Sequence, residues 1–128
     1  MKQDIFKYIK NGSRHLVSWM HSGVEVTIDC TDDTAAFMSK DQQHIVVENW
    51  KDKKLEIYSA RGDKLGAISI ESNMFSYRGL NYCHTSSSGI SIIVIPKDGL
   101  FDNPHDDLIQ LDVDVKNMKI GKKVAIYR

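Results

Sequence analysis

Neither sign of charge is in excess in this sequence. Lysine and arginine together number 17, as do aspartate and glutamate, so the formal net charge is zero. A strongly basic chain would favour nucleic acid or an anionic membrane as its partner, and this balance favours neither. Long apolar runs are also missing, since the longest aliphatic run, residues 92–95, is far shorter than the roughly 20 residues of a membrane-spanning helix. The length of 128 residues predicts a single folded domain, residues 1–128.

Cysteine is scarce, with Cys30 and Cys83 as the two examples in the chain. Residues 1–15 have neither the continuous apolar stretch nor the small-residue cleavage site of a secretion signal, and the sequence opens on methionine as a complete chain would. We therefore expect a cytoplasmic protein in which both thiols are reduced, small and buried.

Motifs of known chemistry are absent. The sequence contains no G-x-S-x-G nucleophile turn, no phosphate-binding loop, no dinucleotide fingerprint and no H-E-x-x-H zinc motif. Cys83 and His84 are adjacent, and neighbours on a strand point to opposite faces, so they make a poor pair of nucleophile and base. We expect no enzyme activity, no cofactor and no metal. An enzyme that pairs Cys83 with a distant histidine is the alternative.

Two segments have the spacing of short helices. In residues 2–10 the apolar side chains recur at helical spacing, and Asn11-Gly12 follows as a helix stop. Residues 31–39 begin with a threonine or aspartate cap before an Ala-Ala-Phe-Met run. We therefore predict a short N-terminal helix and a second short helix near 31–39.

Most of the remaining sequence has the period of strands. Residues 24–29 and 108–115 alternate apolar with polar side chains, as half-buried strands do. Residues 89–96 are apolar on both faces, which predicts a strand in the middle of a sheet. Turn residues separate about seven or eight such runs, and we interpret Arg61-Gly62-Asp63 as one of the hairpin turns. The prediction is an α+β, mainly β fold, with a predominantly antiparallel sandwich or open half-barrel and the two helices above.

Charge is strongly segregated along the chain. From Ser72 to Pro96 the sequence contains a single charged residue, Arg78. Residues 116–128 carry five basic residues and no acid. Between these segments lie six aspartates with no lysine or arginine among them: Asp98, Asp102, Asp106, Asp107, Asp112 and Asp114.

Such a concentration of aspartate suggests a basic partner. Short carboxylates present a phosphate-like array that steers a positively charged protein toward it. Our hypothesis is a protein-binding module, specifically a bacterial immunity or antitoxin protein that covers the basic active site of a toxin such as a nuclease. The expected contacts are Asp98, Phe101, Asp102, His105, Asp106, Asp107, Asp112 and Asp114.

Alternatives remain for the end of the chain. Asp112 and Asp114 should share the exposed face of a strand and could hold Mg²⁺ for phosphoryl chemistry, although a solvated strand face explains them too. The aspartates do not have the register of a calcium loop. The basic residues of 116–128 could follow a nucleic-acid backbone. They could equally protect an edge strand from aggregation, or pair with the aspartates across a hairpin.

Overall fold

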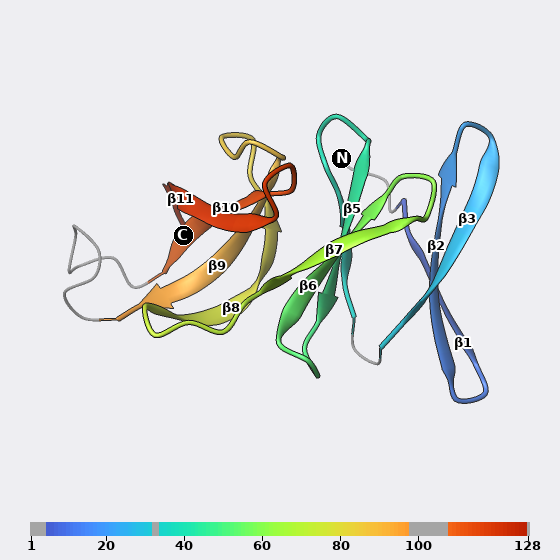
Figure 1. The fold of residues 1–128 in the computed structure, drawn as a ribbon, viewed down its shortest axis with the longest axis horizontal. Helices are drawn as coiled ribbons and strands as arrows, with labels where there is room; N and C mark the ends of the chain where they lie inside the picture. The colour runs from blue at the N-terminus through green and yellow to red at the C-terminus, as the bar shows by residue number, and fades with distance from the viewer. Residues whose placement is uncertain (1–4, 32–33, 98–107, 128) are drawn as a thin grey trace.

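The computed structural model describes residues 5–31, 34–97 and 108–127, and this part of the chain contains strands and no helix. Eleven strands in these residues form three antiparallel sheets, which stand side by side in Figure 1. A helical membrane span is accordingly not found in the described part of the chain.

Each sheet is a meander in which strands that are consecutive in sequence pair with one another. Sheet A contains β1 (Lys7–Asn11), β2 (Arg14–His21) and β3 (Val24–Cys30). Sheet B contains β4 (Ala36–Met38), β5 (His44–Asn49), β6 (Lys54–Ser59) and β7 (Lys64–Ser69). Sheet C contains β8 (Phe75–Tyr82), β9 (Ile90–Pro96), β10 (Ile109–Asp114) and β11 (Lys119–Ile126).

The predicted helix over residues 2–10 is wrong. Residues 7–11 form β1, which pairs with β2 across the two-residue loop Gly12-Ser13. Gly12 has a φ of 64°. A glycine at positive φ can end a helix or open a two-residue hairpin, so the Asn-Gly signal fits both structures. The adjacent strand β2 decides between them, because so short a segment gains little from helical hydrogen bonds alone.

The predicted helix near residues 31–39 is also wrong. Residues 36–38 form β4, which pairs with β5, and the Glu48 N–H donates to the Ala35 carbonyl at 2.8 Å. The Ala-Ala-Phe-Met run favours a helix by propensity, but the buried strand β5 supplies backbone partners to this segment at residues 44–48. The class is therefore all-β with eleven strands in the described residues, and the α+β prediction with seven or eight strands is wrong. The predicted antiparallel pairing is confirmed.

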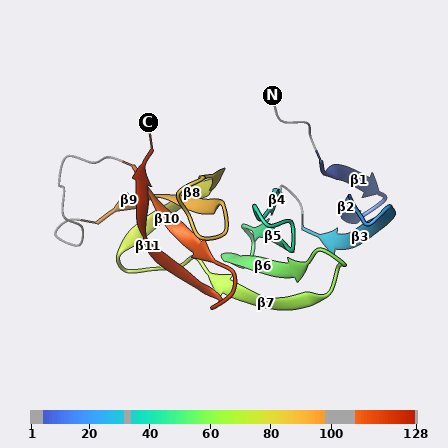
Figure 2. The same cartoon turned by 90° about the horizontal axis from the view of Figure 1, so that it is seen from above.

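Sheet B is the middle layer, and both of its faces are buried. On β5, Val46 belongs to the core shared with sheet C, whereas Ile45 and Val47 belong to the core shared with sheet A. Neighbouring residues on a strand point to opposite faces, so the apolar run of residues 45–47 in β5 can serve both cores. Figure 2 shows sheet B between the other two sheets. Three layers thus replace the predicted sandwich or half-barrel.

Several local predictions are confirmed by the sheet order. β9 lies between β8 and β10, which is the central position predicted for residues 89–96. Its second face is less buried than its first, since Ile95 is 40% exposed. Residues 61–63 form the turn between β6 and β7, closed by a hydrogen bond of 2.8 Å from Ser59 N–H to the Asp63 carbonyl.

We expect replacement of Gly62 by alanine to lower the free energy of unfolding by about 2 kcal/mol. Gly62 has a φ of 97°, and an added Cβ would lie 2.7 Å from Val26 Cγ1 on β3. Backbone strain and overpacking would therefore act together. Urea unfolding measures the difference.

The matched control is Gly23→Ala. Gly23 also has positive φ, 80°, but an added Cβ there would meet no atom within 4 Å. We expect this control to cost about 1 kcal/mol from backbone strain alone. Equal losses in the two variants would show that the contact with Val26 contributes nothing.

Candidate functional site

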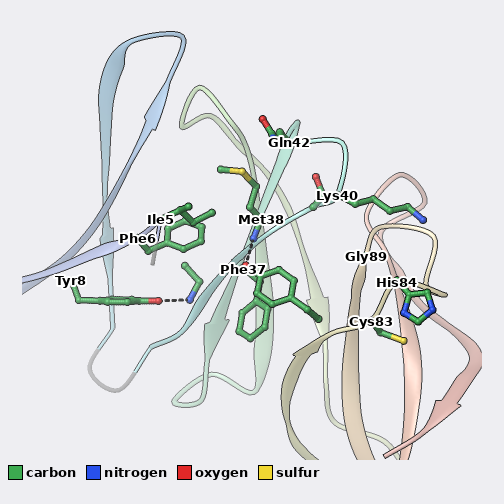
Figure 3. Close-up of a pocket in the computed structure, with 13 residues that line it drawn as sticks. Ile5, Phe6, Tyr8, Phe37, Met38, Lys40, Gln42, Cys83, His84 and Gly89 are labelled. Carbon is green, nitrogen blue, oxygen red and sulfur yellow. Dashed lines mark hydrogen bonds between the residues drawn. The ribbon is translucent and has the colours of Figure 1, made fainter. Parts of the chain in front are cut away.

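An open groove of about 920 Å³ lies where the first strands of the three sheets approach one another. Side chains from β1, β4 and the end of β8 line it. In Figure 3, Phe6 and Tyr8 stand on one side and Cys83 and His84 on the other, with Phe37 between them. The fold therefore brings together three segments that are far apart in the sequence.

The outer edge of β4 faces this groove. The backbone groups of Ala35 and Ser39 are hydrogen-bonded to β5. Because alternate residues of an antiparallel pair are hydrogen-bonded, Phe37 also faces β5, and the N–H groups of Ala36 and Met38 point the opposite way. Ala36 N–H donates to the Tyr8 hydroxyl at 2.9 Å, and Met38 N–H donates to the Tyr82 hydroxyl at 3.2 Å. Two tyrosines, one from sheet A and one from sheet C, thus occupy the positions that carbonyl groups of a further strand would take.

Aromatic rings form much of the groove wall. The rings of Phe37 and Tyr82 have their centroids 4.5 Å apart at an interplanar angle of 38°. Tyr8 is 49% exposed, Tyr82 36% and Ile5 47%. Tyrosine combines an apolar ring with a polar tip and is enriched where proteins meet partners. Exposed apolar side chains are therefore gathered on the wall of this groove.

The far wall is the loop of residues 83–89, and it is held against the residues that follow β4. Lys40 N–H donates to the Ser88 carbonyl at 2.7 Å, and Lys40 Nζ donates to the Ser86 carbonyl at 2.8 Å. Gly89 has a φ of 83°, and an added Cβ would lie 2.9 Å from Lys40 Cβ. This close approach requires glycine at position 89, and it ties sheet C to the edge of sheet B.

The turn between β4 and β5, which contains Lys40, is held by the side chain of Asp41. The Asp41 carboxylate accepts the Ser39 hydroxyl at 2.5 Å and the Gln43 N–H at 3.0 Å. The Ser39 hydrogen bond, and then the Gln43 hydrogen bond, lower the pKa of Asp41 below its ordinary value. The turn is therefore held by a charged carboxylate at neutral pH.

The groove carries positive rather than negative charge. Among the described residues that line it, Lys40 carries a formal charge and no carboxylate is present. The Lys40 ammonium has three N–H donors, and one of them is directed to the Ser86 carbonyl. The site can therefore meet a hydrogen-bond acceptor or an anionic group at this end.

Among the described residues, the hydrogen-bond partner of the Cys83 thiol is a threonine hydroxyl. Cys83 is 8% exposed, and its Sγ lies 3.1 Å from the Thr85 hydroxyl, which donates to the Val124 carbonyl. Burial, followed by the charges of Asp29 and Glu56, raises the pKa of the Cys30 thiol. A raised thiol pKa keeps the sulfur protonated and weakly reactive. Both thiols are free cysteines.

Most of the predicted partner contacts fall in residues 98–107, outside the described residues, and their role stays a prediction. Asp112 is described, and its predicted position on a solvated face is wrong because the residue is 8% exposed. Its two carboxylate oxygens accept the Ser87 N–H at 2.9 Å and the Ser87 hydroxyl at 2.7 Å. Asp112 therefore anchors the loop that forms the far wall of the groove. The contacts outside the described residues are Asp98, Phe101, Asp102, His105, Asp106 and Asp107.

Asp114 has a separate set of partners. Its carboxylate accepts the Asn117 N–H at 3.1 Å and the Asn117 side-chain amide at 2.8 Å. These hydrogen bonds lower the pKa of Asp114, and the charge of Lys119 lowers it further. The carboxylates of Asp112 and Asp114 therefore have different hydrogen-bond partners and do not form one site. Within the described ranges, no group of three or more histidine, cysteine, aspartate or glutamate side chains could hold a metal ion.

The basic end of the chain lies at a sheet edge. β11 is the outermost strand of sheet C, in line with the hypothesis that its lysines protect an edge. Lys119 is also the cross-strand neighbour of Asp114, as a hairpin pairing would require. Arg128 lies outside the described residues, and nucleic-acid binding by this segment stays a prediction.

Sequence reasoning missed the groove. The two predicted helices include Tyr8 and Phe37, and the predicted partner contacts do not include Tyr82. No local pattern connects three aromatic residues so far apart, because the connection runs through the packing of separate sheets. The one usable signal was the presence of aromatic side chains at positions that are half exposed once the strands form.

Comparisons with protein-family models, with curated proteins and with solved structures found no match for this chain. The function is therefore argued from the geometry and chemistry of the groove.

Proposed function

We propose that this protein works by binding another protein, and that the partner docks in the groove between β1, β4 and β8. The observation that carries this proposal is the convergence of aromatic side chains from three sheets on one open hollow, with the rings of Tyr8 and Tyr82 more than a third exposed. Tyrosine is enriched among residues that dominate binding energy, since its ring buries a large area and its hydroxyl keeps a polar partner.

The chemistry of the groove supports binding rather than catalysis. The sulfur of Cys83 is directed to the Thr85 hydroxyl, and Lys40 is held by backbone carbonyls. A catalytic nucleophile needs a base within hydrogen-bond distance and a third group to orient that base. The described residues around Cys83 do not supply such a chain of contacts, whereas a partner surface needs only complementary shape and polarity.

We propose further that the partner is a toxin with a basic surface, neutralised in the bacterial cytoplasm. The support for this finer proposal lies in the sequence, in the aspartates between residues 98 and 107. They would attract a basic partner over long range, and the groove would anchor it. The acidic segment and the groove address different parts of the partner.

The test is capture from native cells with three tagged versions of the protein. The groove variant is Tyr8→Ala with Tyr82→Ala. The control is Met20→Ala with Val24→Ala, at residues 60% and 63% exposed that lie outside the groove. We expect one protein to be retained by the wild type and by the control, and its affinity for the groove variant to be at least roughly tenfold weaker.

Thermal unfolding of each version confirms that it is folded. With the partner in hand, Asp106→Lys combined with Asp107→Lys is expected to slow association and to flatten its salt dependence. Failure to retain any protein, or equal retention by all three versions, would refute docking in the groove. Unchanged association after the charge reversal would refute the acidic contribution.

A further inference from the structure

We infer that the groove binds an extended peptide segment carrying a carboxylate, and that this segment pairs with the outer edge of β4 after displacing the hydroxyls of Tyr8 and Tyr82. The inference deepens the proposed function and rests on it for its biological role, because it names the kind of segment that the partner inserts.

The hydrogen-bonding pattern of β4 selects an extended backbone. The N–H groups of Ala36 and Met38 both point away from β5, two residues apart, as on the open edge of any strand. In a strand the carbonyl of a residue points the same way as its N–H, so this edge also offers acceptors. Donors and acceptors at that spacing match a peptide added as a further strand.

The two tyrosines protect this edge in the free protein. Exposed strand edges invite pairing with other chains, and proteins usually block them with charge, proline or a bulge. Here the hydroxyls of Tyr8 and Tyr82 accept the edge N–H groups. Both side chains are more than a third exposed, and in this inference they turn toward solvent to release the edge. A peptide carbonyl can then replace each hydroxyl at little net cost.

Charge complementarity specifies the peptide further. Lys40 is the formally charged side chain among the described residues that line the groove, and no carboxylate there balances it. Lys40 follows the end of β4 by two residues, and its ammonium lies at the far wall of the groove, where it donates to the Ser86 carbonyl at 2.8 Å. An ammonium has three N–H donors, so two remain for a carboxylate at that wall. An aspartate or glutamate near one end of the bound segment would meet it. Apolar side chains of the segment would lie against Phe37 and the tyrosine rings.

The test begins with a displayed library of random peptides of about nine residues, long enough to span β4 and its flanks. We expect enriched peptides to alternate apolar residues with polar ones and to carry an acidic residue toward one end. Synthetic versions methylated on alternate backbone nitrogens should lose at least roughly tenfold in affinity in one of the two registers, because methylation removes the donor and obstructs pairing. Absence of enrichment, or tolerance of methylation in both registers, would overturn the inference.

Variants of the protein separate displacement from direct contact. Tyr8→Phe with Tyr82→Phe keeps both rings and removes the hydroxyls that compete with the peptide. We expect it to bind the selected peptides roughly threefold to tenfold more tightly, since the competing hydrogen bonds no longer have to break. Weaker binding would mean that the hydroxyls contact the peptide themselves, and would overturn the displacement step.

Lys40→Gln tests the carboxylate. We expect it to weaken acidic peptides by roughly threefold to tenfold and to reduce the salt dependence of their binding. Peptides in which asparagine or glutamine replaces the acidic residue should bind both proteins equally. If Lys40→Gln affects neutral and acidic peptides alike, the charge pairing is wrong.

The two proposals fail in different ways. Capture of a partner that depends on the groove, together with no peptide binding, would overturn this inference and leave the proposed function standing. Peptides that bind with the expected pattern, together with no captured protein, would refute the proposed function and support the chemistry inferred for the groove.

Discussion

Replacing Trp19 by alanine is expected to lower the free energy of unfolding by about 3 to 5 kcal/mol. Trp19 is 2% exposed in the core that joins sheets A and B. Its ring packs edge-to-face on Phe6, with centroids 6.0 Å apart, and its Nε1 donates to the Ala60 carbonyl at 2.8 Å. Truncation would leave a cavity and an unsatisfied carbonyl between the sheets. The total free energy of unfolding of a small domain is about 5–15 kcal/mol, so this substitution would remove much of the stability.

Urea unfolding measures this loss, followed by tryptophan fluorescence where Trp19 is present and by circular dichroism for the two variants that lack it. Trp50, which is 37% exposed, is first replaced by phenylalanine so that Trp19 alone reports. Trp19→Phe is the matched control, because it keeps most of the apolar volume and removes the hydrogen bond. It should cost about 1–2 kcal/mol. A similar loss in the alanine and phenylalanine variants would mean that sheet A is not packed on sheet B as described.

The second large effect is expected at the contact between sheets B and C. The Tyr77 hydroxyl on β8 donates to the Glu48 carboxylate on β5, and Glu48 is 6% exposed. Tyr77→Phe would leave this carboxylate buried without that donor. Breaking one side of a buried charged contact is strongly destabilising, and we expect a loss of about 3 kcal/mol. Urea unfolding at neutral pH measures it.

A double-mutant cycle shows whether the loss belongs to this contact. Glu48→Gln removes the charge, and the combination with Tyr77→Phe should cost less than the sum of the two single variants. We expect a coupling of about 1–3 kcal/mol between the two positions. Strict additivity would show that Tyr77 and Glu48 do not interact, whatever each single substitution costs.

The same tyrosine gives stability a pH dependence. Burial, then the hydrogen bond to Glu48 and its charge, raise the pKa of Tyr77 above the ordinary value. The folded chain therefore keeps a proton that the unfolded chain loses, and the associated stability is present in full below about pH 10 and is lost as the pH rises further. Burial also raises the pKa of Tyr58, so part of the alkaline loss remains in Tyr77→Phe. An unchanged slope in that variant would contradict the contribution of Tyr77.

How far the sequence could predict the fold depended on the range of the interactions involved. Alternation within residues 24–29 and 108–115 is visible locally, and those strands are present as β3 and β10. Residues 7–11 and 36–38 have no such local signature. They become strands because β2 and β5 lie beside them, and single-segment spacing does not contain that information.

The candidate site could be predicted even less. The acidic segment drew attention because six aspartates are close together in sequence, yet Asp112 proves to be buried against Ser87 as an anchor for a loop. The groove depends on Tyr8, Phe37 and Tyr82, which come from three different sheets. Their positions relative to one another follow from the packing of those sheets and from no motif.

By itself, the sequence determined the antiparallel, turn-rich character of the chain, the central position of residues 89–96, the turn at residues 61–63 and the absence of recognisable catalytic motifs. These follow from side-chain periodicity and turn preference, which act over a few residues. The tertiary structure alone decided that ambiguous segments are strands, that sheet B is buried on both faces and that two tyrosines cover the edge of β4. Those outcomes depend on backbone and side-chain partners that are distant in sequence, and such partners meet only when the sheets pack.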